Sequence, residues 1–445
     1  MIEPIRFLIA AFSSGLADTA CTDIQSCRTL SQIIGPAITA LIAANYLSIH
    51  MNILHPDLKW YMKAFESAKV FIVALYFPDW IFVWALRSLI LALAARKRLE
   101  HARRVAHDRW ALHYPIASRP TAWKPAQRMI YQFDASYTLA HAFYVIMGGM
   151  HLYAEDGRPI RPLDLETTIK LISQGDIQLP SLEAIEGMSK STYLGQSIAD
   201  LQLAAFLLKC VLRIVYGLTL APFEIMAFAH ASIAVCTFAP WWYKPMSVDN
   251  RTRVPNSLAP VAAAHRSIFP ERTGWQIMYA YIFGNQDTLY PAHKLKAVPT
   301  FWSGDPSCIF ETPQVDPPLP DEPVPAFFVA SVGGAILIFI YGLIHLLGCK
   351  RGTLATDTEW FLWRWAAIII TAAPCFVALA YLLGCGIAIH LRKPEWPNYI
   401  MLVASVFASA AYIVARITLL VLACTSLRRL PIDVYQTGNL PEYFQ

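Results

Sequence analysis

Charged residues are scarce in this sequence: they make up 15% of its 445 residues, whereas apolar residues make up 56%. A soluble globular protein carries roughly 25% charged residues, so the composition argues against a soluble chain. The deficit is concentrated in apolar runs of about 20 residues, which is the length that a helix needs to cross a bilayer. The composition therefore predicts an integral membrane protein and excludes disordered, collagenous and disulfide-scaffold proteins.

The motifs of the common nucleotide-driven and hydrolytic enzymes are also missing. The sequence has no Gly-x-x-x-x-Gly-Lys-Ser/Thr, Gly-x-Gly-x-x-Gly, His-Glu-x-x-His or Gly-x-Ser-x-Gly, and no Asp-rich diphosphate-binding motif. It has no Cys-x-x-Cys, and its 12 histidines are dispersed. ATP-driven pumping and zinc hydrolysis are therefore not expected, and neither a metal site nor a cofactor is predicted.

Hydrophobic windows of about 19 residues predict the fold class. The candidate spans, from clearest to weakest, are 326–348, 361–385, 398–425, 30–52, 70–95, 198–218, 222–240 and 135–153. We expect an all-α protein, a polytopic transmembrane helix bundle of seven to eight spans with an extramembrane loop rich in proline and aromatic residues. The expected segments are an N-terminal segment 1–29, a membrane bundle 30–240, the loop 241–325, a three-helix membrane segment 326–425 and a cytoplasmic tail 426–445.

Two orientations fit the sequence. Placing the basic segments 96–134, 349–351 and 428–429 in the cytoplasm gives eight spans with both termini cytoplasmic. A weak signal peptide over 7–17 would instead give seven spans and a lumenal N-terminus, which a Cys21–Cys27 disulfide would require. Within the loop, 264–303 is aromatic and predicts a packed cap, whereas the proline run 313–325 predicts a stiff tether.

A basic cluster follows the second expected span. A basic run directly after an apolar segment is typical of a cytoplasmic loop beside anionic headgroups, so membrane lipids are expected as partners and nucleic acid is not. The cluster consists of Arg96, Lys97, Arg98, Arg103, Arg104 and Arg109.

Ionisable side chains in hydrocarbon cost about 2.5–3.5 kcal/mol each, so those inside spans are functional candidates. Gln202, Lys209 and Arg213 recur at helical spacing and share one face. They predict a pocket for an anionic headgroup or other polar ligand; alternatively, the two cations extend to the helix end. Glu224 follows Pro222 and predicts either a helix N-terminal cap or a pairing with Lys209 or Arg213.

Two further sets are candidates. Asp134 and His141 are seven residues apart on one helical face, so they predict either a carboxylate-oriented general base or a contact between helices. Arg87 and Arg416 lie deep within spans and need buried acceptors, which Asp79 or Glu224 could supply. Those contacts would be structural ion pairs or part of a transport path.

Several short stretches resemble an uncharacterised family of polytopic fungal integral membrane proteins. The resemblance implies a fungal protein with a many-helix membrane fold, and it implies no particular activity. The similar stretches are Arg28-Thr29-Leu30, His50-Met51-Asn52, Trp84-Ala85-Leu86-Arg87, the run Tyr137 to Phe143 with Gly148-Gly149, Ser189-Lys190, Trp241-Trp242-Tyr243-Lys244-Pro245, and Arg416 to Pro431 with Tyr435.

Three functions fit this sequence. The favoured one is an intramembrane enzyme or accessory protein at the endoplasmic reticulum or another endomembrane, with cyclase- or isomerase-like proton transfer on a lipophilic secondary metabolite such as a polyketide or terpenoid. His141, Asp134 and Glu224 would be its acid–base groups. The alternative is a secondary transporter or channel for an organic anion or small molecule. Arg87, Arg416, Lys209 and Arg213 would lie along its path, and Asp79 or Glu224 would carry protons. The third is a seven-span receptor-like protein.

Overall fold

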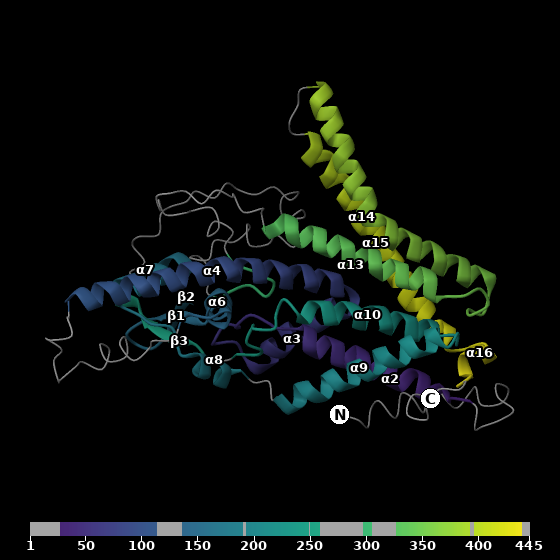
Figure 1. The fold of residues 1–445 in the computed structure, drawn as a ribbon, viewed down its shortest axis with the longest axis horizontal. Coiled ribbons are helices and arrows are strands. Elements are labelled where there is room, and N and C mark those ends of the chain that lie inside the picture. Colours follow the sequence, from purple (N-terminus) through teal and green to yellow (C-terminus); the bar gives the residue numbers. More distant parts are fainter. Residues whose placement is uncertain are drawn as a thin grey trace.

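Long helices dominate the computed structural model, which describes residues 27–113, 136–189, 193–248, 250–258, 297–304, 326–391 and 396–437. The long helices are α2 (Leu30–Ser48), α3 (Trp60–Tyr76), α4 (Pro78–His113), α9 (Tyr193–Val215), α10 (Pro222–Phe238), α13 (Ala326–Gly348), α14 (Asp357–Leu391) and α15 (Trp396–Ser426) (Figure 1). Smaller elements lie between them: α6 (Leu139–Ile146), α7 (Leu165–Gln174), α8 (Leu182–Met188), the short helix η3 (Asn256–Leu258) and α16 (Ile432–Tyr435).

Five helical segments are long and apolar enough to cross a membrane, and they indicate a membrane protein. They are Leu30–Ser48, Pro78–Arg109, Val329–Gly348, Asp357–Ile387 and Tyr399–Ser426. Helix α10 is also apolar but has 17 residues. The described residues therefore contain five candidate membrane spans, whereas seven to eight were expected.

The segment 135–153 does not form the expected span. Helix α6 has eight residues, and it is followed by Gly148 with φ +90°, a conformation that disfavours other residues. At Gly149 a Cβ atom would lie 2.5 Å from the Tyr144 ring, so only glycine fits. These glycines end the helix and lead into a strand.

Because that strand belongs to a β-sheet, the fold is mostly helical but not all-α as expected. Strand β1 (Met150–Tyr153) is the centre of a three-stranded sheet of order β2–β1–β3. It pairs antiparallel with β2 (Pro159–Pro162) and parallel with β3 (Thr252–Pro255), which comes from the expected loop. A parallel partner about 100 residues away leaves no local signal in the sequence.

The expected span 70–95 is divided between two helices. Helix α3 ends at Tyr76 and α4 begins at Pro78, because proline is favoured in the first turn of a helix. Helix α4 then continues to His113, so the basic cluster 96–109 lies on a helix and not in a loop.

The two ends of the bundle collect different parts of the chain. At one end, Arg28 N donates to Tyr435 O (2.8 Å), and the main chain of Cys27 forms an isolated antiparallel β-bridge with that of Gln436. At the same end, Gly348 lies close to Ile225 near the start of α10. The basic half of α4 lies toward the other end, beside the sheet (Figure 1). The segments 349–351 and 96–109 are therefore at opposite ends of the molecule, and the expectation that both are cytoplasmic stays a prediction. Cys27 is disulfide-bonded.

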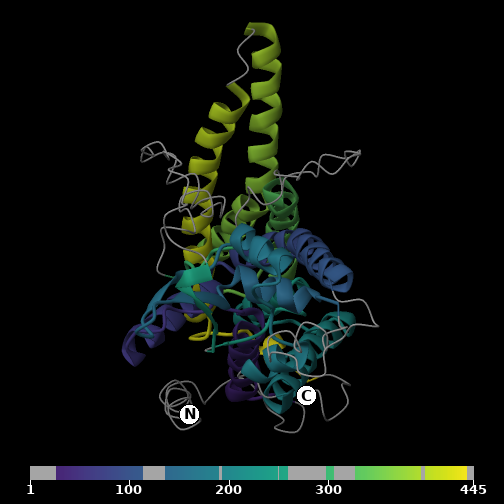
Figure 2. The same ribbon diagram turned by 90° about the vertical axis from the view of Figure 1, so that its left-hand side faces the viewer.

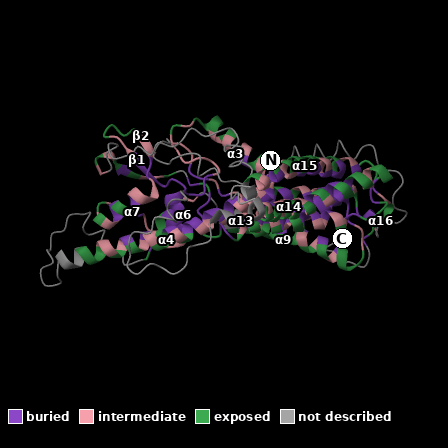
Figure 3. Cartoon of the chain, turned by 90° about the horizontal axis from the view of Figure 1, so that it is seen from above, coloured by how far each residue is buried: buried purple, intermediate pink, exposed green. Residues whose placement is uncertain are grey.

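Helices α14 and α15 form a hairpin that extends away from the rest of the bundle (Figures 1 and 2). Its outer half is largely exposed, whereas burial concentrates in two clusters (Figure 3). One is built mainly from α2, α10, α13 and α15, and the other from α4, α6 and the sheet. An apolar groove of about 380 Å³ lies between the two helices, lined by residues such as Phe376, Leu383, Tyr399 and Phe407. Exposed apolar surface of this kind is typical of contact with lipid.

The remaining predicted segments are described only in part. The possible signal peptide 7–17, most of the predicted cap 264–303 and the predicted tether 313–325 lie outside the described residues. The part of the cap that is described, 297–304, packs against α4 and the chain after α2. Of the tail, α16 is described, and its Val434 and Tyr435 are buried.

Candidate functional site

A buried lysine without an ionic partner is the centre of the candidate site. Lys244 follows α10, and only 3% of its surface is exposed. Its Nζ donates to Asn52 Oδ1 at 3.1 Å and lies 4.7 Å from the Trp84 ring centre and 4.5 Å from that of Trp241. No carboxylate among the described residues lies within ion-pair distance of it. Burial therefore lowers the pKa of the Lys244 amine well below its usual range.

His50 lies beside Lys244, and its ring stacks on Trp241 with the ring centres 5.5 Å apart. Its Nδ1 is 2.8 Å from the Lys244 main-chain oxygen. Because a carbonyl only accepts, Nδ1 carries the proton and Nε2 presents a lone pair. Nε2 is buried and has no hydrogen-bond partner among the described residues. Burial lowers the pKa of His50 to about 4 although hydrogen bonds to the main chain oppose the shift, so the ring is neutral at pH 7.

The walls of the site come from four separate parts of the chain. Trp84 and Ser88 lie on α4, and Ser88 Oγ accepts a 2.6 Å hydrogen bond from Trp241 Nε1. Trp302 O accepts hydrogen bonds from Asn52 Nδ2 (2.8 Å) and Trp84 Nε1 (3.0 Å). We call this set the Lys244 cluster: His50, Asn52, Trp84, Ser88, Trp241, Lys244 and Trp302.

The side chain of Ser189 holds the turn that carries Lys244 in place. Ser189 Oγ donates to Met246 O (2.9 Å) and accepts from Met246 N (3.3 Å). The next residue, Ser247, has φ +52°, an uncommon conformation for a residue with a side chain. The chain is therefore held in one geometry immediately after the lysine.

His141, a predicted catalytic residue, is engaged in hydrogen bonds within α6. Its Nδ1 accepts from Thr138 N (3.1 Å) as part of the helix N-terminal cap, and its ring also bonds to the main chain of Pro180. Burial lowers the pKa of His141. Asp134 lies outside the described residues, so the Asp134–His141 pair stays a prediction.

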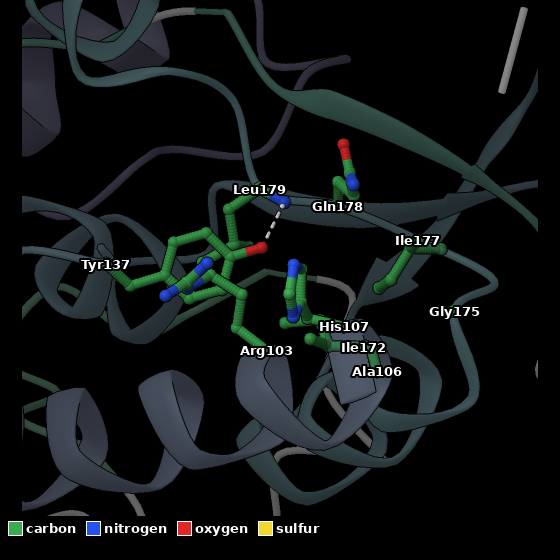
Figure 4. Close-up of a pocket in the computed structure, with 9 residues that line it drawn as sticks. All are labelled: Arg103, Ala106, His107, Tyr137, Ile172, Gly175, Ile177, Gln178 and Leu179. Atoms are coloured by element: carbon green, nitrogen blue, oxygen red, sulfur yellow. Dashed lines mark hydrogen bonds between the residues drawn. The ribbon is translucent and has the colours of Figure 1, made fainter. Parts of the chain in front are cut away.

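A small cavity lies next to Tyr137, whose ring packs against His141 at 5.2 Å between ring centres. Its volume is about 30 Å³, close to the share of one water molecule in the liquid. Figure 4 shows the Tyr137 hydroxyl at its edge, accepting a hydrogen bond from Leu179 N (3.3 Å). The cavity is too small for an organic substrate.

Glu224 forms the predicted cap, but its ionic partner differs from those expected. Its Oε2 accepts from Ala221 N (2.9 Å), and its carboxylate is bonded by both terminal nitrogens of Arg28 (2.5 and 2.7 Å). Arg213 instead donates to the main-chain oxygens of Thr219, Val434 and Gln436. These contacts tie the α9–α10 turn to both described ends of the chain.

The other predicted residues lie at separate places. Gln202 is exposed on α9 and Lys209 is half-buried on the same helix, so they do not gather with Arg213 in a closed pocket. Arg416 Nη2 bonds to Asp79 (2.8 Å), one of the two acceptors considered, and Tyr412 OH donates to the same carboxylate (2.6 Å). Arg87 is buried on α4.

His50, Asn52 and Lys244 were not predicted as functional residues. Lys244 lies beyond the expected span 222–240, and His50 and Asn52 stand at the very end of the expected span 30–52. One signal was present: the stretches that contain them carry the family resemblance. Residues from four of those stretches, including Ser189 and Trp84, meet around the turn that carries Lys244. Among the residues with described positions, no group of three His, Cys, Asp or Glu side chains could hold a metal ion.

Comparison with known proteins gives one match. Residues 5–266, more than half of the chain, match a family of unknown function (DUF8562). No curated protein matches the chain, and no solved structure does. The matched region includes every member of the Lys244 cluster except Trp302. The chain therefore belongs to this family of unknown function.

Proposed function

We propose that this membrane protein binds a lipophilic small molecule at the Lys244 cluster and acts on it as an intramembrane enzyme. One observation carries the proposal: two basic nitrogens, Lys244 Nζ and His50 Nε2, are buried among indole rings without a neighbouring described carboxylate. An unpaired basic group is costly to bury, and such groups are concentrated at functional sites. His141 and Glu224, by comparison, are engaged in caps of helices.

The surroundings favour an apolar ligand. Indole rings from Trp84 and Trp241 provide apolar walls around the Lys244 amine, and the polar contact of the amine is with Asn52 Oδ1. Trp242 and Tyr243, in the same turn as Lys244, are exposed aromatic side chains of the kind found at membrane interfaces. A lipophilic molecule, such as a polyketide or terpenoid, would reach the cluster from the bilayer.

An endomembrane location accords with this function. The disulfide at Cys27 needs an oxidising compartment, which the lumen of the endoplasmic reticulum provides. In this arrangement the end of the bundle with Cys27 is lumenal, and the Lys244 end is closer to the cytoplasm.

Metabolite profiling tests the proposal. A host strain that lacks the gene is complemented with the wild type, Lys244→Met or, as a matched control, Lys170→Met, whose lysine is exposed on α7. We expect a lipophilic product to be lost and its precursor to accumulate in the deletion and in Lys244→Met cells, at equal protein levels in membranes. Lys170→Met should restore the product.

Two results would contradict the proposal. If Lys244→Met fully restored the product, the Lys244 cluster would not take part in the activity. A compound that only shifts between cells and medium would favour the transport alternative.

A further inference from the structure

We propose that Lys244 forms an imine with the carbonyl group of a lipophilic aldehyde or ketone. The inference rests on the proposed function, because it names the class of substrate for the same cluster. Its basis is the placement of the Lys244 amine, whose only hydrogen-bond acceptor among the described residues is the neutral amide oxygen of Asn52 at 3.1 Å.

The cluster favours a neutral amine over an ammonium ion. An ammonium group has three N–H donors, but the described surroundings of Nζ offer one acceptor and two indole faces. A lysine that is desolvated in this way keeps its nitrogen lone pair and becomes a nucleophile toward carbonyl carbons. The lowered pKa of Lys244 agrees with this geometry.

The same walls suit the product. A protonated imine carries a delocalised positive charge, and Trp84 and Trp241 present their ring faces where that charge would lie. Asn52 Oδ1 can accept the single remaining N–H. The cluster can therefore stabilise the imine without a carboxylate counter-ion.

The reaction balances without any further reagent. The Nζ lone pair attacks the carbonyl carbon, a C–N bond forms, and the C=O π electrons move to oxygen. After a proton passes from nitrogen to oxygen, the C–O bond of the carbinolamine breaks and the leaving hydroxyl takes up one proton from water. An amine, a carbonyl and one proton thus yield a protonated imine and one water. His50 Nδ1, which donates to the Lys244 main-chain oxygen at 2.8 Å, holds the lysine in position for this attack.

Segment 299–302 binds the residue that accepts from the amine. Asn52 Nδ2 donates to the main-chain oxygens of Pro299 (3.0 Å) and Trp302 (2.8 Å), and Thr300 Oγ1 donates to Glu66 (2.8 Å). These hydrogen bonds fix the Asn52 amide, so that its Oδ1 faces the Lys244 amine.

Reductive trapping tests the inference. Full-length wild-type protein in phosphatidylcholine nanodiscs is incubated at pH 7.4 with hexadecanal and sodium cyanoborohydride, and its peptides are mapped by mass spectrometry. We expect a hexadecyl group on Lys244 at a level at least about tenfold above that on exposed Lys170, because each unit of lowered pKa raises the neutral fraction about tenfold. Lys244→Arg should remove this adduct and leave that on Lys170 unchanged.

A second probe separates this inference from the proposed function. A diazirine derivative of hexadecan-1-ol has no carbonyl group, so its photo-crosslinks report binding alone. Crosslinks on peptides of the cluster, with Lys244 labelled no more than Lys170, would overturn the imine and leave the proposed function intact. Absence of both crosslinks and the Lys244 adduct would overturn both. Because each map is made on the wild type, the result does not depend on how a variant folds.

Discussion

At the scale of single residues, the buried ion pairs in the described part of this protein contrast with the buried Lys244. Glu224 with Arg28, and Asp79 with Arg416, form hydrogen-bonded ion pairs between distant parts of the chain. Removing one member of such a buried pair costs about 3–5 kcal/mol, because the other charge stays buried. Lys244 has only a neutral amide as acceptor among the described residues, so its burial is expensive unless the amine is neutral. This contrast separates structural charges from a reactive one.

The pKa of His50 predicts that acid destabilises the protein. The group titrates at about 6.5 when unfolded and about 4 when folded, so the unfolded state binds the proton first. The stabilising effect of the neutral ring is complete above pH 6.5 and is lost as the pH falls from 6.5 to 4. At pH 5 the loss is about 2 kcal/mol. We expect the melting temperature to fall less between pH 7 and pH 5 in His50→Asn than in the wild type.

The choice of asparagine at position 50 controls for loss of the hydrogen bond. Asparagine keeps a donor for the Lys244 main-chain oxygen, so the variant removes the titrating group and retains the hydrogen bond. His101→Gln, at an exposed position on α4, should leave the pH profile unchanged. An equal decrease in melting temperature for wild type and His50→Asn would show that His50 does not contribute to acid sensitivity.

The sequence predicted the role of a residue only where that role depends on residues nearby in the sequence. Pro222 and Glu224 are two positions apart, and their spacing predicted the cap that Glu224 forms. The partner of that carboxylate, Arg28, is 196 positions away and could not be inferred from spacing. The Lys244 cluster likewise joins positions 52, 84, 244 and 302, so no local pattern indicates it.

At the scale of elements, apolar runs predicted helices well where glycine and proline did not intervene. The three C-terminal spans agree with α13, α14 and α15 within a few residues at most ends. The failures have physical causes: Gly148 and Gly149 end α6, and Pro78 starts a new helix. Glycine inside a helix has the opposite role here, since Gly342 lets α13 approach α14 closely.

Gly342→Ala should therefore destabilise the contact between α13 and α14. A Cβ atom at this position would lie 2.6 Å from the Thr371 main-chain nitrogen, which cannot move aside without shifting α14. Overpacking of this kind typically costs about 1–3 kcal/mol. Gly386→Ala in α14 is the matched control, because its Cβ meets nothing within 4 Å. A thermal unfolding series in detergent should show a lower melting temperature for the first variant only; equal values would contradict the close contact.

At the scale of the whole molecule, one misassigned span changes the predicted sidedness of the chain. Counting 135–153 as a span placed the basic half of α4 and the segment 349–351 on the same side. Without that span, every later segment changes side, and the structure has these two segments at opposite ends. Counting basic residues in the loops could not reveal that 135–153 is not a span, because both segments carry arginine and lysine.

Site-directed labelling can check this arrangement. His101→Cys lies on the basic half of α4, and Lys350→Cys lies in the α13–α14 turn; both positions are exposed. In sealed microsomes we expect a membrane-impermeant maleimide to label His101→Cys directly and Lys350→Cys only after permeabilisation. The parent protein gives the background from native cysteines. Direct labelling of both variants would contradict the opposed ends.

The hydrogen bonds that Trp302 O accepts from Asn52 and Trp84 also impose an order on biosynthesis. A ribosome translates Asn52, Trp84 and Lys244 before Trp302, so the helices around the lysine can assemble while segment 299–302 is still unmade. During that interval Asn52 Nδ2 and Trp84 Nε1 lack the acceptor that Trp302 O later provides. Water or the insertion machinery has to accept hydrogen bonds from these two donors until the chain has grown past Trp302.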